Sequence, residues 1–267
     1  MRPIIFAWPE GKSGAVTSSW DDGQIHDRRL VALLNERGLK GTWNLNASIF
    51  DVSDDHLRAS EIRELFKGHE VACHTLNHPH LESQPDQYIL YEVFENRRRL
   101  ESLVGYPVRG FAFPFGTYDL RAVDILKQCG LLYCRTINQS TRQGLPPDFW
   151  QWHPTCHCRV DLLKSWNQFC KLSQPDKIFF VWGHSWEFER HGGWENFAAF
   201  SEVCGATDSV WHATNIDIVK YVTAWRNLWC SVTGSIVYNP SATSLWFRCG
   251  GDLFEAFPGK TLLIDGA

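Results

Sequence analysis

The chain has 267 residues, with hydrophobic and charged fractions of 44% and 21%, which are ordinary values for a globular protein with a large core. Its formal net charge of -4 at pH 7 and the lack of a basic stripe argue against a nucleic-acid or acidic-membrane partner. No apolar run reaches the length of a membrane-spanning helix.

Strand-like and helix-like segments alternate through most of the chain. Residues 15–20 predict a strand that ends in a turn at Asp21-Asp22-Gly23, and residues 27–35 carry apolar side chains at helical spacing. Further predicted strands are 42–45, 71–73, 111–113, 131–134 and 178–182, and further predicted helices are 61–66, 86–104, 119–129, 196–204 and 216–226. This alternation predicts a parallel sheet with outer helices, either open or closed into a barrel.

The sequence changes character after about residue 230. Short strand-like segments at 235–238, 244–247, 253–256 and 260–264 are separated by Asn-Pro, Gly-Gly and Pro-Gly turns. We therefore predict an α/β domain over residues 1–230 and a small antiparallel β appendage over residues 231–267. A structural role for this appendage is favoured over carbohydrate binding.

The amino-terminal residues and the cysteines bear on the cellular compartment. The apolar stretch in residues 1–9 is too short for a signal peptide and is interrupted by Pro3 and Pro9. The nine cysteines are odd in number and follow no framework spacing, which fits a reducing compartment better than a disulfide scaffold. We therefore expect a cytoplasmic protein.

Polar residues follow several predicted strands, at the edge where α/β folds place their active sites. His74 and His78 lie four apart, and imidazole is a preferred ligand of zinc and related metals, although the pair alone fits two surface histidines equally well. Asp21 and Asp22 form a carboxylate pair, which is costly to bury at a strand end without a compensating cation. Two histidines and one carboxylate would leave metal positions open for water and substrate.

Four motifs over about residues 15–185 resemble those of one enzyme family. The first, usually Thr-Phe-Asp-Asp-Gly, is matched by Ser19-Trp20-Asp21-Asp22-Gly23, and the second, His-Ser/Thr-x-x-His-Pro, by His74-Thr75-Leu76-Asn77-His78-Pro79. The third, an arginine followed by Pro-Tyr/Phe-Gly, resembles Arg109-Gly110-Phe111-Ala112-Phe113-Pro114-Phe115-Gly116, and the last, an apolar strand ending in histidine, resembles Val181-Trp182-Gly183-His184. This order is similar to that of the polysaccharide deacetylases, the NodB-homology or carbohydrate esterase 4 group.

The resemblance implies a fold, an activity and a metal. The fold is a distorted (β/α) barrel, and the activity is metal-dependent removal of N- or O-linked acetyl groups from a saccharide. Asp22, His74 and His78 would bind one divalent ion, zinc in the first place, with cobalt or nickel as alternatives.

The resemblance also implies the roles of the reacting groups. Asp21 would be the general base for the water at the metal, and Arg109 would pair with Asp21 and keep it ionised. His184 would be the general acid that donates a proton to the leaving amine or alcohol.

Further residues would contact the substrate. The backbone N–H of Phe115, in the turn that begins at Pro114, would stabilise the oxyanion. Trp152 and His157 would line the substrate cleft.

The fourth family motif, Asp-x-x-Asp-Trp, is incomplete in this sequence. Residues 148–152 read Asp-Phe-Trp-Gln-Trp, so Gln151 stands where the second aspartate would tune the acid histidine. A neutral amide does not stabilise His184 as imidazolium in the same way. The candidate substitutes are His157, Asp161 and Glu187.

Other functions remain open. An amide or cyclic-imide hydrolase acting on a small cytoplasmic metabolite would keep the metal and suit a protein without a signal peptide. Gln151 and the terminal strands would suit an inactive carbohydrate-binding relative, but pure binding needs neither a base nor an acid. An iron oxygenase with two histidines and a carboxylate is disfavoured by the alternation of strands and helices.

Overall fold

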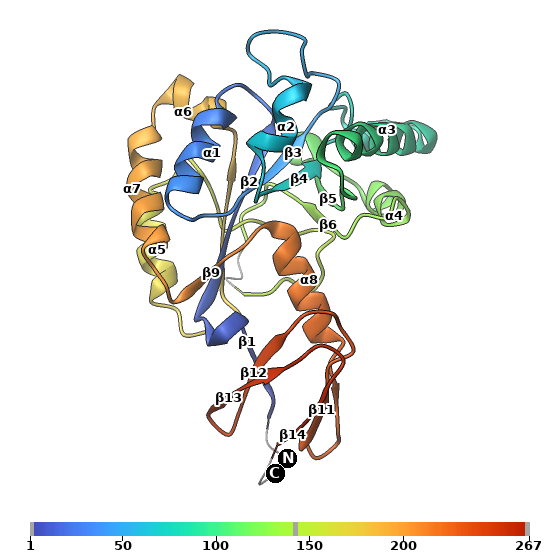
Figure 1. The fold of residues 1–267 in the computed structure, drawn as a ribbon. Helices are drawn as coiled ribbons and strands as arrows, with labels where there is room; N and C mark the ends of the chain where they lie inside the picture. Colours follow the sequence, from blue (N-terminus) through green and yellow to red (C-terminus); the bar gives the residue numbers. More distant parts are fainter. Residues whose placement is uncertain (1–2, 141–143, 265–267) are drawn as a thin grey trace.

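The computed structural model describes residues 3–140 and 144–264, and a curved parallel sheet forms its centre (Figure 1). The strand order is β6-β5-β4-β3-β2-β8-β7, and β9 pairs with the start of β2. The strands are β2 (Gly14–Asp22), β3 (Thr42–Leu45), β4 (Glu70–Cys73), β5 (Gly110–Ala112), β6 (Tyr133–Arg135), β7 (Cys156–His157), β8 (Ile178–Gly183) and β9 (Val210–His212). Because these strands are parallel, their carboxyl ends meet at one rim.

An irregular segment bridges the two edges of this sheet. The backbone N–H of Cys134, in β6, donates to Phe149 O at 2.8 Å, and that of Trp152 donates back to Cys134 O at 2.9 Å. A few residues on, the backbone N–H of Thr155 donates to Phe180 O in β8 at 2.8 Å. The sheet is thus closed into a distorted barrel, which confirms the predicted fold.

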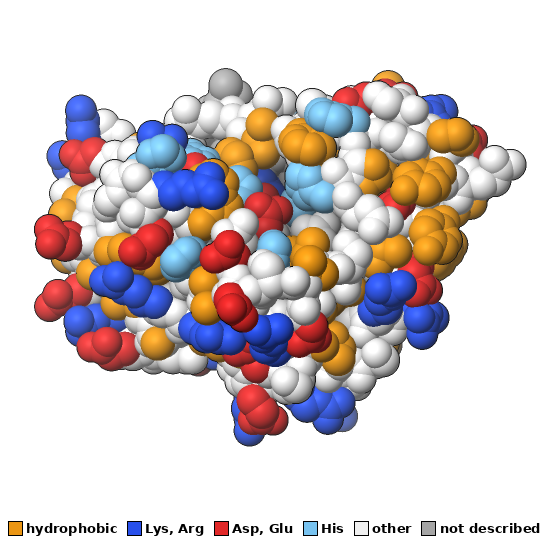
Figure 2. Space-filling view, turned by 90° about the horizontal axis from the view of Figure 1, so that it is seen from above, with side chains coloured by type: hydrophobic (Ala, Val, Ile, Leu, Met, Phe, Trp, Pro, Cys, Tyr) orange, Lys and Arg blue, Asp and Glu red, His pale blue; other side chains and the backbone are white. Residues whose placement is uncertain are grey.

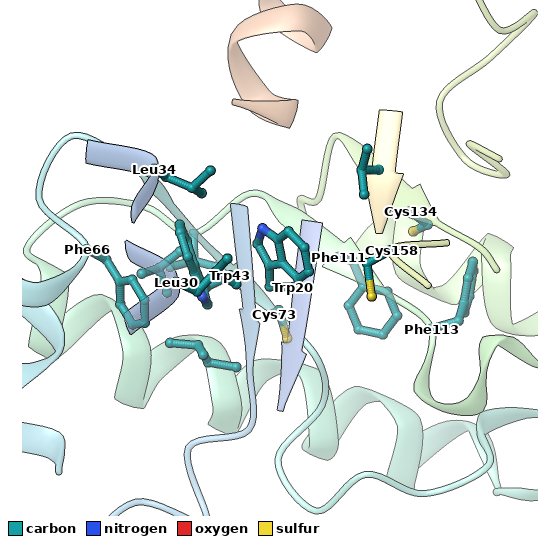
Figure 3. Packing of buried hydrophobic residues seen from close by; sticks show 14 of the residues in the cluster. Trp20, Leu30, Leu34, Trp43, Phe66, Cys73, Phe111, Phe113, Cys134 and Cys158 are labelled. Atoms are coloured by element: carbon teal, nitrogen blue, oxygen red, sulfur yellow. The ribbon is translucent and has the colours of Figure 1, made fainter. Parts of the chain in front are cut away.

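Helices cover the outside of the sheet (Figure 1). They are α1 (Asp27–Glu36), α2 (Ile62–Leu65), α3 (Asp86–Val104), α4 (Leu120–Gln128), α5 (Leu162–Cys170), α6 (Ser185–His191), α7 (Trp194–Gly205) and α8 (Asn215–Arg226). The core lies between the helices and the sheet, where Trp43 packs on Phe66 with ring centroids 4.9 Å apart (Figure 3). Trp20 packs on Phe197, with centroids 5.3 Å apart. This packing fixes the strands whose ends carry the polar residues.

Helix α8 lies at the amino ends of the strands, on the side away from that rim (Figure 1). The backbone N–H of Asn215 donates to the hydroxyl of Thr42 at 3.0 Å, and that of Ile216 donates to the carboxyl of Glu70 at 2.8 Å. These buried acceptors satisfy the first N–H groups of the helix. They hold α8 against the amino ends of β3 and β4.

Two small antiparallel sheets follow α8, and the predicted antiparallel strands are confirmed. One has the order β1-β12-β13, with β1 (Ile5–Ala7), β12 (Leu245–Cys249) and β13 (Asp252–Ala256), and the other has the order β10-β11-β14, with β10 (Trp229–Cys230), β11 (Ile236–Tyr238) and β14 (Thr261–Leu263). Strand β1 comes from the other end of the chain. Tyr221 in α8 contacts both β1 and β12: its hydroxyl donates to Ala7 O at 2.6 Å and accepts from Trp246 N at 3.0 Å.

The predicted boundary between residues 230 and 231 stays a prediction, and so does the cytoplasmic location. Within residues 3–140 and 144–264, no helix combines the length and apolarity needed to cross a membrane.

Candidate active site

Asp22, His74 and His78 converge at the carboxyl ends of β2 and β4. One oxygen of Asp22 (Oδ1) lies 3.8 Å from Nε2 of each histidine, and the two Nε2 atoms are 3.2 Å apart. Ligand atoms bound about 2.1 Å from a tetrahedral zinc ion are roughly 3.4 Å apart, so these residues fit such an ion. The three predicted ligands are therefore brought together, and their role stays a prediction.

The surroundings of His74 suit a metal ligand. Its Nδ1 atom lies 2.8 Å from the carbonyl oxygen of Ala112, so an N–H at Nδ1 can donate there and leave the lone pair of Nε2 free. Burial lowers the pKa of His74 to about 4. The ring is then neutral at pH 7, as a metal ligand must be.

A hydrogen-bonded turn brings the two histidines together. The hydroxyl of Thr75 accepts from His78 N at 3.0 Å, and the side chain of Asn46 donates to Thr75 O at 2.9 Å. The buried carboxyl of Glu92 accepts from both the backbone N–H and the side chain of Asn77 at 2.7 Å. The fixed turn therefore holds two imidazoles near each other before any ion binds.

Backbone strain concentrates at this rim. Asp22, Thr75, His78 and Phe115 have φ values of 80°, 64°, 57° and 57°, in the left-handed region that residues other than glycine rarely adopt. Each such conformation costs on the order of 1 kcal/mol or more and persists only where the surrounding structure enforces it. Strained residues at or after the ends of three strands that meet at this rim, β2, β4 and β5, point to a functional site.

Asp21 is buried beside the cluster and is held by two side chains. Its Oδ1 atom accepts from the amide of Asn44 at 2.8 Å, and its Oδ2 atom forms an ion pair with Arg135. Burial alone would raise the pKa of Asp21, but the positive charge of Arg135, with smaller contributions from His74 and His184, lowers it overall. Asp21 is therefore an ionised carboxylate at neutral pH, as a general base must be.

Arg135, not Arg109, pairs with Asp21, so the predicted pairing is wrong. Arg135 is fully buried and ends β6, whereas Arg109 precedes β5. In the register of these strands Arg135 pairs with Ala112, three residues beyond Arg109, which is about 10 Å along a strand. Arg135 directly follows the predicted strand 131–134, and this position at a strand end was the signal in the sequence.

His184, at the end of β8, faces the two carboxylates and has a partner behind it. Its Nε2 atom lies 3.9 Å from Asp21 Oδ2 and 3.8 Å from Asp22 Oδ2, and its Nδ1 atom lies 3.2 Å from Glu187 Oε2. Burial alone would lower the pKa of His184, but the hydrogen bond with Glu187 and the nearby carboxylates raise it overall.

Of the three suggested substitutes for the missing aspartate, Glu187 is the one that contacts His184. Gln151 instead accepts a hydrogen bond from the hydroxyl of Tyr118 at 3.0 Å. Asp161 caps α5 by accepting from Lys164 N at 2.9 Å. His157 contacts Glu187 itself, with 3.0 Å between its Nε2 atom and Oε2 of the carboxylate.

A cavity of about 300 Å³ lies over these groups. Its lining combines the polar side chains Asp21, Asp22, His74, His78 and His184 with the apolar side chains Phe113, Phe115, Ile137, Trp182 and Trp186. Figure 2 shows this face, where histidine and acidic side chains sit in a hollow bordered by hydrophobic ones. Phe115 is half exposed, and its ring stacks on His80 with centroids 3.9 Å apart.

Of the four predicted substrate contacts, Pro114, Trp152 and His157 do not line this cavity. Trp152 is only 3% exposed, packs against Tyr133, Phe149 and Phe180 inside the barrel, and does not line the cavity. Its predicted contact with substrate is wrong, because the bridging segment uses its ring to fill the core. Pro114 is buried and begins the turn that presents Phe115. His157 packs against Trp182 and contacts Glu187, so it is not part of the cavity wall. The substrate role of Phe115 stays a prediction.

Comparison with known proteins agrees with this geometry. Residues 9–134 match the family model for polysaccharide deacetylase. Residues 9–134 of the chain belong to the polysaccharide deacetylase family. This confirms the resemblance seen in the motifs. Arg135, His184 and Glu187 lie beyond the matched residues.

Solved structures share the fold of this chain. A protein from Mycobacterium smegmatis assigned to the same family is 18% identical, with a TM-score of 0.61 over 85% of this chain and 96% of that one. A family 4 carbohydrate esterase from Streptomyces lividans, solved with acetate, is 15% identical, with a TM-score of 0.52 over 76% and 93%. A family 4 pseudoenzyme from Bacillus anthracis is 17% identical, with a TM-score of 0.50 over 81% and 68%. None of the curated proteins matches the chain.

Proposed function

We propose that this protein is a metal-dependent hydrolase that removes N- or O-linked acetyl groups from a saccharide. The observation that carries the proposal is the placement of three side chains of metal-ligand type beside a buried ionised aspartate and a histidine. Asp22, His74 and His78 would hold one divalent ion, most simply zinc. When bound, such an ion supplies Lewis acidity to the acetyl carbonyl and to the attacking water.

Asp21 takes the proton of the attacking water. Arg135 keeps the carboxylate charged, and Asn44 fixes its orientation by donating to the other oxygen. An ionised, oriented carboxylate in a buried site accepts a proton without prior reorganisation, which is what general-base catalysis requires.

Two other residues of the cavity wall serve the leaving group and the oxyanion. His184 directs Nε2 toward the cavity and donates a proton to the departing amine or alcohol. The backbone N–H of Phe115 stabilises the developing oxyanion, since the left-handed turn places this residue at the wall of the cavity.

The cavity supports a second candidate function. A volume of about 300 Å³ is at the small end of ligand sites and suits one sugar unit or a small metabolite. Its walls are mainly aromatic and aliphatic. These features also favour an amide or cyclic-imide hydrolase that uses the same metal, base and acid.

Acetate release tests the proposal. Zinc-loaded protein is incubated with acetylated chito-oligosaccharides, acetylated xylan and a set of small amides and cyclic imides. We expect acetate from a saccharide, and at least a 100-fold lower rate for Asp21→Asn with zinc still bound, because the base is lost. Asp252→Asn, an exposed position, is the control.

Three outcomes would reject this function or change it. Zinc-loaded protein that releases no acetate from any saccharide contradicts deacetylation. Turnover of cyclic imides alone would assign the second candidate function. Equal residual turnover by wild type and Asp21→Asn would make the chain a carbohydrate-binding relative.

A further inference from the structure

Four donor groups converge on one oxygen atom of Glu187. Its Oε2 atom lies 3.1 Å from the backbone nitrogen of His184, 3.2 Å from Nδ1 of the same residue, 3.0 Å from Nε2 of His157 and 3.6 Å from the thiol sulfur of Cys158. His157 ends β7, Cys158 follows it, and His184 follows β8. A carboxylate with so many charge-assisted partners is held in one position.

The helix geometry explains only one of these contacts. Glu187 is the third residue of α6, and as in a capping box its carboxylate accepts the N–H of the residue that precedes the helix. Capping does not require the contacts to the two imidazoles. The side chain of Glu187 is also only 7% exposed, whereas capping glutamates on a surface helix are free to face water.

The contact to Nδ1 decides which way the ring of His184 faces. An imidazole whose Nδ1–H donates to a carboxylate presents Nε2 on its opposite edge. That Nε2 atom lies 3.8 Å from Asp22 and lines the cavity. Glu187 stays ionised in this arrangement: burial would raise its pKa, but the hydrogen bonds and charges of His157 and His184 lower it overall.

The packing around Glu187 leaves little room for other arrangements. Gly183 precedes the acid histidine, and a Cβ atom there would lie 2.3 Å from the thiol of Cys158 and 3.3 Å from Glu187 Oε2. The backbone of β8 therefore approaches the carboxylate closely. His157 holds Oε2 from the other side, so the carboxylate does not turn away from His184.

We propose that Glu187 is the positioning residue of the general acid, and that His157 locks its carboxylate against His184. This proposal rests on the proposed function, in which His184 protonates the leaving group. Glu187 thereby supplies, from the helix that follows the acid, the carboxylate that Gln151 does not supply.

The same atoms could also bind a metal ion. His157, His184 and Glu187 offer ligand atoms within 4.8 Å of one another. An ion there would occupy His184 and remove it from proton transfer. We favour the hydrogen-bonded arrangement because the two imidazole–carboxylate distances, 3.0 and 3.2 Å, are those of hydrogen bonds.

The leaving group of the substrate tests the role of Glu187. Zinc-loaded wild type and Glu187→Gln are compared on an acetylated chito-oligosaccharide, whose amine must be protonated, and on 4-nitrophenyl acetate, whose phenolate leaves unaided. We expect kcat on the amide to fall about 100-fold, KM to change less than about twofold, and turnover of the ester to change less than about threefold. Glu189→Gln, on the same helix but in contact with Trp194, is the matched control.

A spectroscopic readout tests the position of His184 without the reaction. In nitrogen-15 spectra of the histidine side chains, the Nδ1–H signal that is missing in His184→Gln should also be lost in Glu187→Gln and kept in Glu189→Gln. His157→Gln should weaken this signal and lower kcat on the amide by about tenfold, since the carboxylate is then held by fewer partners. If the wild type does not release acetate but the signal behaves in this way, the proposed function fails and the positioning role stands.

Three results would overturn the proposal. The first is an unchanged kcat on the amide in Glu187→Gln. The second is an equal loss on amide and ester together with a lower melting temperature, which would make Glu187 a helix cap only. The third is a drop from two bound zinc ions to one, which would make this cluster a second metal site.

Discussion

The charge of Asp21 depends on one buried arginine from β6, the edge strand of the sheet. Arg135 has no exposed surface, ends β6 and also lies over the ring of Trp182 at 4.8 Å. Removing one partner of a buried ion pair leaves the other as an uncompensated charge, at a cost of about 3–5 kcal/mol. The same change also frees the carboxylate to move.

We therefore expect Arg135→Met to lower kcat/KM at least 100-fold and to lower the free energy of unfolding by about 3 kcal/mol. Arg135→Lys keeps the charge but not the planar fork, so its loss should be smaller. Arg109→Ala should remain within about twofold of wild type. Acetate release and urea denaturation measure both effects, and a larger loss in Arg109→Ala than in Arg135→Met would contradict this assignment.

Single residues show how far sequence predicts the site. Asp22, His74 and His78 could be found because each follows a predicted strand, and parallel strands bring such positions to one rim. Arg135 also follows a strand, but only the pairing of β5 with β6 shows that it comes nearer to Asp21 than Arg109 does. For Glu187 the only indication in the sequence is its position three residues after His184.

Helices α1 and α6 meet at a buried carboxyl group. Asp27, in the first turn of α1, has no exposed surface, and Ser185 and Trp43 lie nearest to it. Within the described part of the chain, neither of its oxygens has a hydrogen-bond partner of normal geometry. Burial raises the pKa of Asp27 to about 7.

This raised pKa predicts a dependence of stability on pH. The folded protein then holds the Asp27 proton up to about pH 7, whereas the unfolded chain releases it near pH 4, so stability from this group is lost as pH rises between these values. Between pH 5.5 and 8 the wild type should lose ~2 kcal/mol that Asp27→Asn keeps. Urea denaturation of metal-free samples at both pH values measures this difference, with Asp252→Asn as the exposed control. Equal losses in wild type and Asp27→Asn would show that Asp27 titrates normally.

Helices and strands were predicted best where residues typical of a start or an end mark their limits. Helix α3 runs over Asp86–Val104, as predicted, because Pro85 suits a helix start and Gly105 takes the left-handed conformation at its end. The segment at 149–155 has no such signals. Its hydrogen bonds join residues of β6 and β8 that are distant in sequence, and such pairing leaves no periodic pattern. For this reason Trp152 was assigned to the cleft instead of the core.

The whole molecule combines a barrel with two small sheets. One of these sheets pairs β1, from near the start of the chain, with strands that follow α8. The repeated strands and helices predicted the barrel, and the turns after residue 230 predicted the antiparallel strands. The pairing of β1 with β12 was not predicted, because three residues near the start of the chain carry too little pattern to indicate a partner. This pairing and Tyr221 attach the sheets to the side opposite the candidate active site (Figure 1).

The proposed hydrolase activity requires one metal ion at Asp22, His74 and His78. The most direct measurement is a titration of metal-free protein with zinc, in which acetate release from an acetylated saccharide is followed at each ratio. We expect a rate that rises in proportion to zinc and levels off at one ion per chain, and no rise for His78→Ala. Full activity without added metal, or a plateau that requires two ions, would contradict this proposal.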